Sequence, residues 1–399
     1  MRVPEATIRG DVDDGYGPVA DAFRANFEHR GEVGAACAIY RDSQKVVDIW
    51  GGFRNGKQLT PWQQDTMLLV FSASKGMAAA AMAIAHSQRL FGYEDRVAEI
   101  WPEFARGGKE EVTVRELLSH RAGVPKLDER VSLARLRDTE WLSRALADQA
   151  PSWTPGTDHG YHGVTLGWYQ SEMLRRLDPE GRRMGKFFAE QVADRLGVDF
   201  YFGLPDSVDE RRLAYIHAYG PLAMLLNLNK MPRAMLTGML NPAGLGHQVM
   251  RTLPDLVKER KINRREMLAL EAPSVLGVGE ARAMARVYGS MATGGGELGL
   301  QADTLRELEK PAPWGRDRVL KVDTCFSLGF IKPFPGFGFG TSDRAYGAPG
   351  GGGSFGMADP DAGIGYAYAM NRLGFHFPAD PRERAVRSAF YEVIGERAQ

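Results

Sequence analysis

The chain has 399 residues and a formal net charge of zero, from 50 Lys and Arg against 50 Asp and Glu. This length allows one large domain or two ordinary ones. The charge balance argues against a nucleic-acid or anionic-membrane binder, which usually carries a basic excess. Two cysteines, Cys37 and Cys325, are too few for a disulfide framework or a thiolate zinc site. We therefore expect a globular protein with no nucleic-acid or membrane partner.

The start of the chain does not read as a signal peptide. It carries five acidic residues before any long apolar run, whereas a signal peptide needs a basic start and about 7–15 apolar residues. The longest charge-free stretches, 213–229 and 234–250, are interrupted by polar residues and fall short of the roughly 20 apolar residues that span a bilayer. We therefore expect a cytoplasmic protein.

The first predicted elements are a helix, a hairpin and a second helix. Residues 16–30 carry apolar side chains at helical spacing. Two β-rich runs, 35–40 and 45–50, surround turn residues 41–44 and predict a hairpin. Residues 72–90 are mostly small and apolar, which predicts a long buried helix.

The rest of the chain is helical in the middle and strand-rich near the end. Residues 98–270 show helical patterns broken by Pro and Gly loops, and a further helix is expected over 281–292. Strand-like runs follow at Cys325–Ile331 and Gly363–Met370, and a helix over 381–394 ends the chain. This order predicts a mixed α/β (α+β) fold: an antiparallel sheet built from both termini, flanked by helices, with an all-helical insertion.

The same order predicts two domains. Residues 1–95 and 271–399 would form the sheet domain, and 96–270 the helical domain. Within the latter, a segment of about 201–270 resembles a lid, because it is rich in flexible methionines. Ordinary helical core and an acyl-binding wall over the site are equally good interpretations. Its methionines are Met224, Met231, Met235, Met239 and Met250.

The first candidate for chemistry is the pair Ser72 and Lys75, at the start of the long buried helix. Side chains three residues apart on a helix share one face, and a partly buried lysine favours its neutral, basic form. The motif alone is weak, because chance supplies about 0.5 such pairs in a chain of this composition. The apolar helix that follows makes a merely solvated lysine a poor interpretation.

Three further segments extend the pattern. They are Leu117-Leu118-Ser119-His120-Arg121-Ala122-Gly123, Pro155-Gly156 followed by Tyr161-His162, and the Gly-rich stretch 347–360 with 365–371 after it. Together they resemble the serine β-lactamase and penicillin-binding-protein superfamily, in its class C-like branch, and most closely the family VIII carboxylesterases. The resemblance runs from about residue 15 to 390.

The resemblance implies roles for matching positions. Ser72 would be the nucleophile that forms an acyl-enzyme, and Lys75 its proton acceptor. Tyr161 matches the catalytic tyrosine, and a phenol near an ammonium loses its proton more readily. The β-lactamases continue this motif with asparagine two residues on, where this chain has Gly163 after His162, which puts efficient β-lactam hydrolysis in doubt. His162 is a candidate for substrate contact.

The third superfamily motif, Lys-Thr-Gly or His-x-Gly, matches a stretch in which Ala348 stands in place of Lys or His. The cationic anchor for a substrate carboxylate is therefore missing. Gly350 and Gly351 follow, and the backbone N–H groups of Ser72 and Gly351 would form the oxyanion hole, which needs no side chain. The implied partner is a small ester or amide without a carboxylate, with no metal or cofactor.

Several other patterns are predicted to be structural. Ser354 sits in a Gly-x-Ser-x-Gly pattern, but a turn and a strand follow instead of the helix that a nucleophile elbow requires. His159 and His162 have metal-like spacing without a convincing third ligand. His120 is interpreted as a core histidine or one that supports the site.

The sequence thus predicts a serine hydrolase that cleaves carboxylic esters. One alternative is an acyltransferase of a natural-product pathway, in which an alcohol or amine replaces water at the same site. Another is a catalytically weak binding or sensor protein on the same scaffold.

Overall fold

The computed structural model describes residues 6–129, 131–219 and 226–396. Its main sheet has the strand order β1-β3-β2-β14-β13-β12-β11-β10, with β4 added to β3, and every pairing is antiparallel. The strands of this sheet are β1 (Ile8–Val12), β2 (Gly34–Arg41), β3 (Gln44–Asn55), β4 (Thr60–Pro61), β10 (Phe326–Ser327), β11 (Phe330–Ile331), β12 (Tyr346–Pro349), β13 (Phe355–Asp359) and β14 (Ile364–Met370).

The centre of the sheet joins the two ends of the chain, as the sequence predicts. Strand β14 pairs with β2 along its whole length, from Ile364 opposite Arg41 to Met370 opposite Ala35. The β2–β3 hairpin and the fold class are confirmed.

The remaining strands form two small sheets, β5-β7-β6 and β8-β9. Strand β6 lies inside the block predicted to be all helical. These strands are β5 (Leu68–Leu69), β6 (Phe200–Phe202), β7 (Gly277–Gly279), β8 (Gly315–Arg316) and β9 (Asp323–Thr324).

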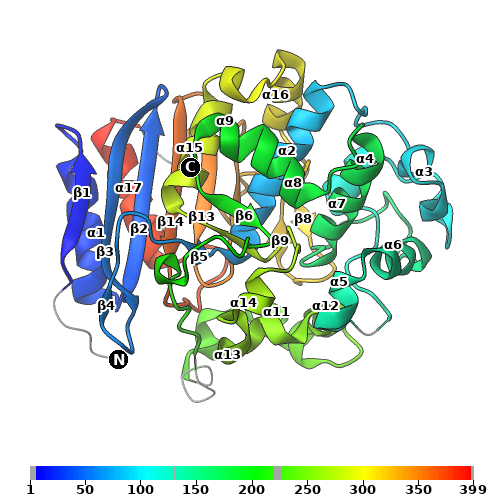
Figure 1. The fold of residues 1–399 in the computed structure, drawn as a ribbon, viewed down its shortest axis with the longest axis horizontal. Coiled ribbons are helices and arrows are strands. Elements are labelled where there is room, and N and C mark those ends of the chain that lie inside the picture. Colours follow the sequence, from blue (N-terminus) through cyan, green and yellow to red (C-terminus); the bar gives the residue numbers. More distant parts are fainter. Residues whose placement is uncertain (1–5, 130, 220–225, 397–399) are drawn as a thin grey trace.

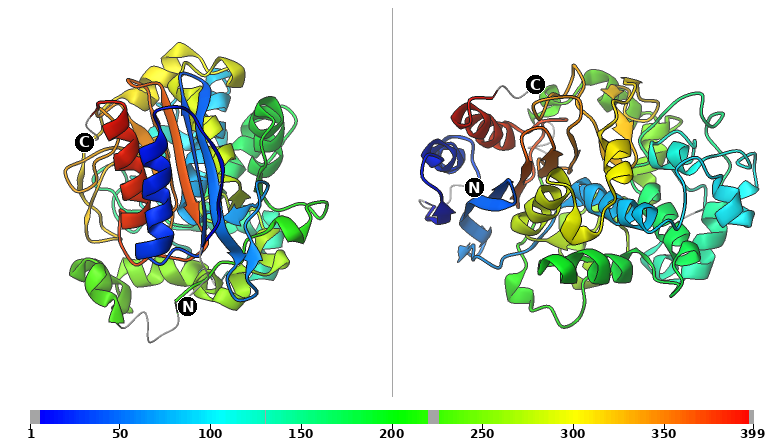
Figure 2. Two further views of the ribbon diagram at one scale, coloured as in Figure 1. Left: turned by 90° about the vertical axis from the view of Figure 1, so that its left-hand side faces the viewer. Right: turned by 90° about the horizontal axis from the view of Figure 1, so that it is seen from above.

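Helices cover both faces of the main sheet. Helices α1 and α17 lie side by side across one face, and α15 packs on the other (Figure 2). Most other helices lie beyond α15 and α2, on the side of the molecule away from β1 (Figure 1). The longer helices are α1 (Gly17–His29), α2 (Ser74–Ser87), α6 (Thr139–Asp148), α7 (Thr165–Leu177), α11 (Arg233–Leu240), α12 (Leu245–Thr252), α15 (Ala281–Ala292), α16 (Ala302–Glu309) and α17 (Pro381–Val393).

Short helices and turns link these elements. The α-helices are α3 (Val97–Ile100), α4 (Val114–Leu118), α5 (Leu133–Arg137), α8 (Met184–Phe188), α9 (Asp194–Leu196), α13 (Glu259–Ile262) and α14 (Arg265–Leu268). The 3-10 turns are η1 (Phe71–Ala73), η2 (Pro102–Ala105), η4 (Glu210–Arg212), η5 (Leu228–Lys230), η6 (Pro254–Val257) and η7 (Gly296–Leu298), and η3 (Ala189–Ala193) is a π-helical turn. In the part of the chain that the structure describes, no helix has both the length and the apolar character needed to cross a membrane.

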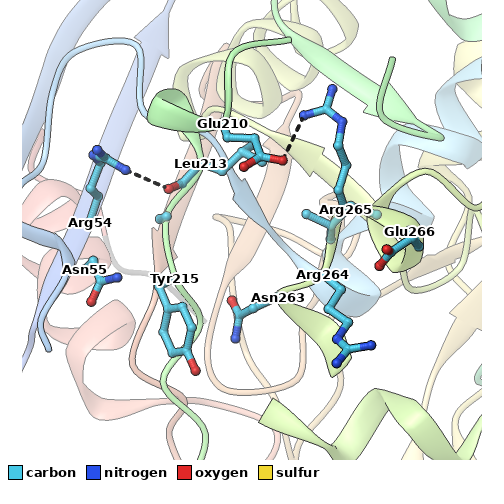
Figure 3. Close-up of a pocket in the computed structure, with 11 residues that line it drawn as sticks. Arg54, Asn55, Glu210, Leu213, Tyr215, Asn263, Arg264, Arg265 and Glu266 are labelled. Carbon is cyan, nitrogen blue, oxygen red and sulfur yellow. Dashed lines mark hydrogen bonds and ion pairs between the residues drawn. The ribbon is translucent and has the colours of Figure 1, made fainter. Parts of the chain in front are cut away.

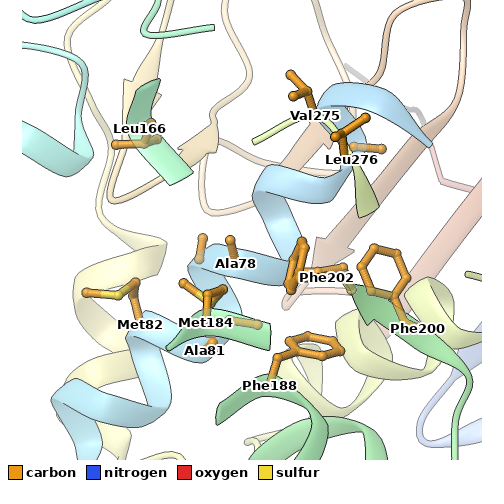
Figure 4. Close-up of a cluster of buried hydrophobic side chains, with 14 of the residues drawn as sticks. Ala78, Ala81, Met82, Leu166, Met184, Phe188, Phe200, Phe202, Val275 and Leu276 are labelled. Atoms are coloured by element: carbon orange, nitrogen blue, oxygen red, sulfur yellow. The ribbon is translucent and has the colours of Figure 1, made fainter. Parts of the chain in front are cut away.

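Helix α2 lies at the centre of the larger hydrophobic core, and all of its residues are buried. Its Ala78, Ala81 and Met82 face apolar side chains from α7, α8 and β6 (Figure 4). Small residues let these neighbours pack closely, as Gly76 shows, since a Cβ there would collide with the hydroxyl of Tyr288. The chemistry predicted at the start of α2 therefore sits on a rigid element.

One predicted strand is a hairpin. Residues Cys325–Ile331 form β10 and β11, which turn at Leu328 and Gly329 with positive φ angles of 51° and 92°. Positive φ is uncommon for leucine, so the residue type at position 328 did not indicate a turn. The two-domain division stays a prediction, and within its lid-like segment residues 220–225, including Met224, lie outside the described residues.

Candidate active site

Ser72 lies at the entrance to helix α2, in the turn η1. Strand β7 holds this entrance in place. The Val70 N–H donates to the Gly277 carbonyl at 3.0 Å, and the Gly277 N–H donates to the Ser74 hydroxyl at 2.9 Å. Phe71, directly before Ser72, has a positive φ of 50°, which is uncommon for a bulky residue. Contacts between distant parts of the chain therefore impose the local geometry of Ser72.

Lys75 is buried one helical turn after Ser72, with its Nζ 3.2 Å from the Ser72 Oγ. The amine donates to the main-chain carbonyls of Gly163 at 2.7 Å and Ser274 at 2.9 Å. Burial lowers the pKa of Lys75 well below its usual value, and no neighbouring carboxylate opposes this shift.

These contacts match the needs of a neutral amine. A neutral lysine has two N–H bonds and one lone pair, and the two carbonyls accept from both N–H bonds. The lone pair of the neutral amine then points toward its third neighbour, the Ser72 hydroxyl. The predicted pair Ser72 and Lys75 is thus arranged for proton transfer from the hydroxyl to the amine.

Tyr161 completes the group from the loop before α7. Its ring centroid lies 4.6 Å from the Lys75 Nζ, and its hydroxyl is hydrogen-bonded to Ser72. Burial raises the pKa of Tyr161 well above its usual value, although the Ser72 hydrogen bond opposes this. The phenol is therefore protonated at neutral pH. This differs from the readily ionised phenol that we expected, because burial of the phenol itself raises its pKa. The buried Lys75 also favours its neutral amine over the ammonium.

The glycine turn after β12 lies against the residues that flank Ser72. A Cβ at Gly350 would collide with the Val70 carbonyl, and one at Gly351 would lie 3.8 Å from the Cβ of Phe71. The missing side chain at 350 therefore lets the end of β12 approach η1 closely. Ala348, in β12, is buried and lines the cavity that also contains Ser72.

A cavity of about 40 Å³ opens over Ser72, and apolar side chains form most of its wall. Among the described residues that line it, Lys75 is the one that carries an amine. No guanidinium or second amine there faces a substrate carboxylate. The lining residues are Ser72, Lys75, His120, Tyr161, Leu320, Thr324, Phe326, Gly329, Ile331, Ala348, Pro349 and Phe377.

The structure does not bring His162 into this lining. Its Nδ1 donates to the Gly160 carbonyl at 2.7 Å, and its Nε2 accepts from the Val124 N–H at 2.9 Å. Burial lowers the pKa of His162 to about 3, so the ring is neutral. Both nitrogens are therefore occupied by main-chain groups.

Ser354 lies in the turn directly before strand β13 and is buried. Its carbonyl accepts from the Gly350 N–H at 2.6 Å. No helix follows it, so the strand–turn–helix setting of a nucleophile elbow is absent at this position.

Several residues around the site could not be predicted from the sequence. Asp317 is buried in the β8–β9 loop and accepts from the Val319 and Leu320 N–H groups, both at 2.7 Å, and from the backbone of Tyr161. This loop places Leu320 in the cavity, and Phe377 reaches it from the loop after β14. Loop residues carry no periodic pattern, so only the fold reveals them.

Part of the predicted lid-like segment also touches the site. Leu245 and Val249, on helix α12, belong to a small apolar cluster with Trp153 and Val319, and Tyr161 packs against it. This contact suits the interpretation of the segment as a wall beside the site.

A larger pocket of about 490 Å³ lies elsewhere, between residues 54–55, 210–215 and 263–268. Arg54 donates to the Leu213 carbonyl and Arg265 is paired with Glu210 (Figure 3). No serine, cysteine or histidine lines this pocket among the described residues, so the chemistry is assigned to the Ser72 cavity.

Comparisons with known proteins identify the family of the chain. The family model described as Beta-lactamase matches residues 19–390. The chain is 32% identical over 382 residues to "Esterase/beta-lactamase LipL" of Mycobacterium tuberculosis (strain ATCC 25618 / H37Rv), which covers 93% of this chain and 85% of that protein.

Solved structures show the same likeness. A family VIII carboxylesterase superposes with a TM-score of 0.86 at 35% identity, covering 97% of this chain and 100% of that one. EstA from Arthrobacter nitroguajacolicus Rue61a superposes with a TM-score of 0.82 at 31% identity, covering 96% and 98%. With its fold, its Ser72 site and a family match over most of its length, the chain belongs to the beta-lactamase family.

Proposed function

We propose that the chain is a serine esterase that cleaves small, uncharged carboxylic esters through an acyl-enzyme on Ser72. One observation carries the proposal: the Lys75 amine donates to two carbonyls and meets the Ser72 hydroxyl in its third direction. The similarity to an esterase/beta-lactamase and to a family VIII carboxylesterase supports the same class of reaction.

In the first half of the reaction, the Ser72 oxygen attacks the ester carbonyl and its proton passes to the neutral Lys75. The N–H groups of Ser72 and Gly351 donate to the resulting oxyanion. The carbon–oxygen bond to the alcohol then breaks, and the phenol of Tyr161 gives its proton to the leaving oxygen. The Lys75 ammonium returns a proton to Tyr161, which leaves an ester on Ser72 and both groups neutral.

In the second half, water attacks the acyl-enzyme, and Lys75 accepts one water proton. The tetrahedral intermediate releases the Ser72 oxygen, which regains a proton from the ammonium through the hydrogen-bonded site. The products are the carboxylic acid and the regenerated hydroxyl. General acid–base steps of this kind contribute about 10²–10⁴-fold each.

The cavity lining supports an uncharged substrate. Ala348 stands where a cation would hold a carboxylate, and the wall is otherwise apolar apart from Ser72, Lys75, His120, Tyr161 and Thr324. A carboxylate placed there would lose its hydration without a partner. The small volume favours short acyl groups.

The test is hydrolysis of p-nitrophenyl acetate and butyrate by the wild type, Ser72→Ala and Ser354→Ala. We expect Ser72→Ala to lose at least about 10³-fold in kcat/KM and Ser354→Ala to stay within about threefold. A fluorophosphonate should label the peptide that contains Ser72. Equal turnover by Ser72→Ala and the wild type would refute the proposal.

Two further comparisons define the substrate. Mono-p-nitrophenyl succinate matches the butyrate ester but ends in a carboxylate, and we expect its kcat/KM to be at least about tenfold lower. Product analysis with added alcohol or amine tests the transfer alternative, which uses the same acyl-enzyme. If adding the alcohol or amine leaves the ratio of carboxylic acid to transfer product unchanged, hydrolysis is supported.

A further inference from the structure

His120 follows helix α4 and is fully buried beside the site. Its φ is +61°, a left-handed conformation that is uncommon for residues other than glycine. Such strain persists only where the surrounding structure imposes it, and it is frequent near functional sites. The contacts of His120 indicate what holds it in this conformation.

His120 contacts the backbone on both sides of Tyr161. Its carbonyl accepts from the Gly160 N–H at 3.0 Å, and its Nδ1 accepts from the His162 N–H at 2.9 Å. Its ring centroid lies 5.3 Å from that of Tyr161. One residue thus holds the chain immediately before and immediately after the phenol-bearing residue.

The hydrogen bonds define the state of the ring. Because Nδ1 accepts, the proton of the neutral imidazole must be on Nε2. Nε2 has no partner among the described residues. Burial, aided by the nearby His162 and Lys75, lowers the pKa of His120 well below its usual value. A protonated ring would present N–H to N–H at His162, so the neutral ring is the one that fits.

We infer that His120 is a positioning residue for Tyr161: its carbonyl and its Nδ1 fix residues 160–162 so that the phenol stays against Lys75 and Ser72. This rests on the proposed function, in which Tyr161 protonates the leaving group. A displacement of about 1 Å in such a group can cost about 10²-fold in rate.

Two substitutions at His120 distinguish the effect of losing the Nδ1 acceptor from the effect of the positive φ angle. Asparagine and glycine both tolerate positive φ, but the Oδ1 of asparagine can take the place of Nδ1 and accept the same N–H. We expect His120→Gly to lower kcat for p-nitrophenyl acetate by about 10–100-fold with KM within about threefold. His120→Asn should recover most of this loss.

A matched control is another buried histidine. His86, at the far end of α2, bonds through Nδ1 to the Thr304 hydroxyl and lies outside the cavity lining. His86→Ala should reduce thermal stability and leave kcat within about twofold. Equal activity of His120→Gly and the wild type, or equal losses in His120→Gly and His120→Asn, would overturn the inference. If His120→Gly does not fold, His120→Asn is compared with the wild type directly, and a folded His120→Asn that loses more than about tenfold in kcat would overturn the inference.

A double-mutant cycle tests whether His120 acts through Tyr161. In a Tyr161→Phe background, His120→Gly should change the residual kcat by less than about twofold, because the proton donor is already gone. The same 10–100-fold loss in both backgrounds would indicate a general structural role and overturn the inference. If Ser72→Ala and Tyr161→Phe keep wild-type turnover, the proposed function itself fails, whatever His120→Gly does.

Discussion

Two buried lysines, Lys75 and Lys109, both donate to main-chain carbonyls, but they differ in their other neighbours. The Lys109 amine donates to three main-chain carbonyls, those of Arg106 at 2.6 Å, Ala147 at 2.9 Å and Gln149 at 2.6 Å. Three acceptors require the three N–H bonds of an ammonium. Lys75 instead meets two carbonyls and one hydroxyl.

The charges around the two amines also favour an ammonium at Lys109 and a neutral amine at Lys75. Burial lowers the pKa of Lys109 to about 8, while the carboxylates of Asp148 and Glu110 oppose the shift. At Lys75 burial acts alone, and its pKa falls well below the usual value. Burial by itself therefore does not make a lysine a base. We propose that Lys75 acts as a base because its lone pair is free to face Ser72 and no carboxylate among the described residues opposes its pKa shift.

The largest expected effect is on activity. Lys75→Met should lower kcat/KM for p-nitrophenyl acetate by about 10³-fold, because the hydroxyl loses its proton acceptor. Lys109→Met is the matched control and should retain kcat/KM within about twofold. Comparable losses in the two variants would contradict the distinction between the lysines.

The pH profile tests the state of Lys75. In the proposed mechanism the neutral amine is the active form, so kcat/KM should fall about tenfold per pH unit below the pKa of Lys75. Since burial lowers this pKa, the fall should begin well below 10.5, the ordinary value for lysine. Rates at constant ionic strength provide the measurement. If kcat/KM still rises between pH 9 and 10.5, Lys75 is an ammonium in the free enzyme at neutral pH, which would contradict the prediction.

Lys109→Met should act on stability. Three buried carbonyls lose their donor, and each buried polar group left without a partner costs about 1–3 kcal/mol, partly offset because no ammonium is then buried. We expect the free energy of unfolding in urea to fall by about 2 kcal/mol. An unchanged midpoint would show that water replaces the amine without loss.

The smallest effect concerns acid stability near the site. The pKa of His162 is about 3 in the folded chain against 6.5 as the ordinary value. The unfolded chain therefore binds a proton first as the pH falls, and stability drops between about pH 6.5 and 3. From pH 7 to 5.5 the loss from His162 should be about 1 kcal/mol. Urea unfolding of the wild type and His162→Leu measures it, and the variant should lose less.

Much of the fold was predictable because it follows from short-range pattern. Alternation and helical spacing predicted the hairpin of β2 and β3, the buried helix α2 and the terminal helix α17. The β10–β11 hairpin and strand β6 were missed. Leu328 takes an uncommon positive φ, and β6 has three residues, too few to show alternation.

The site was predictable in part for the same reason. Helical spacing predicted that Ser72 and Lys75 lie together, although the structure places Ser72 in the turn η1, directly before α2. Tyr161 came from a resemblance, and its high pKa follows from burial, which no motif displays. The carbonyls of Gly163 and Ser274 could not be predicted, since every residue has a carbonyl and only the fold selects which ones meet the amine.

The amino-acid sequence by itself determined the net charge of zero, the fold class and the serine–lysine pair, because these depend on composition and on the spacing of residues along the chain. The tertiary structure decided that the Lys75 amine has two carbonyls and one hydroxyl as its partners. It also decided that His162 lies outside the cavity lining and that His120 accepts hydrogen bonds from the residues on both sides of Tyr161. Those properties depend on groups from α2 and from the loops after α4, before α7 and before β7, which are far apart in the chain and meet only after folding.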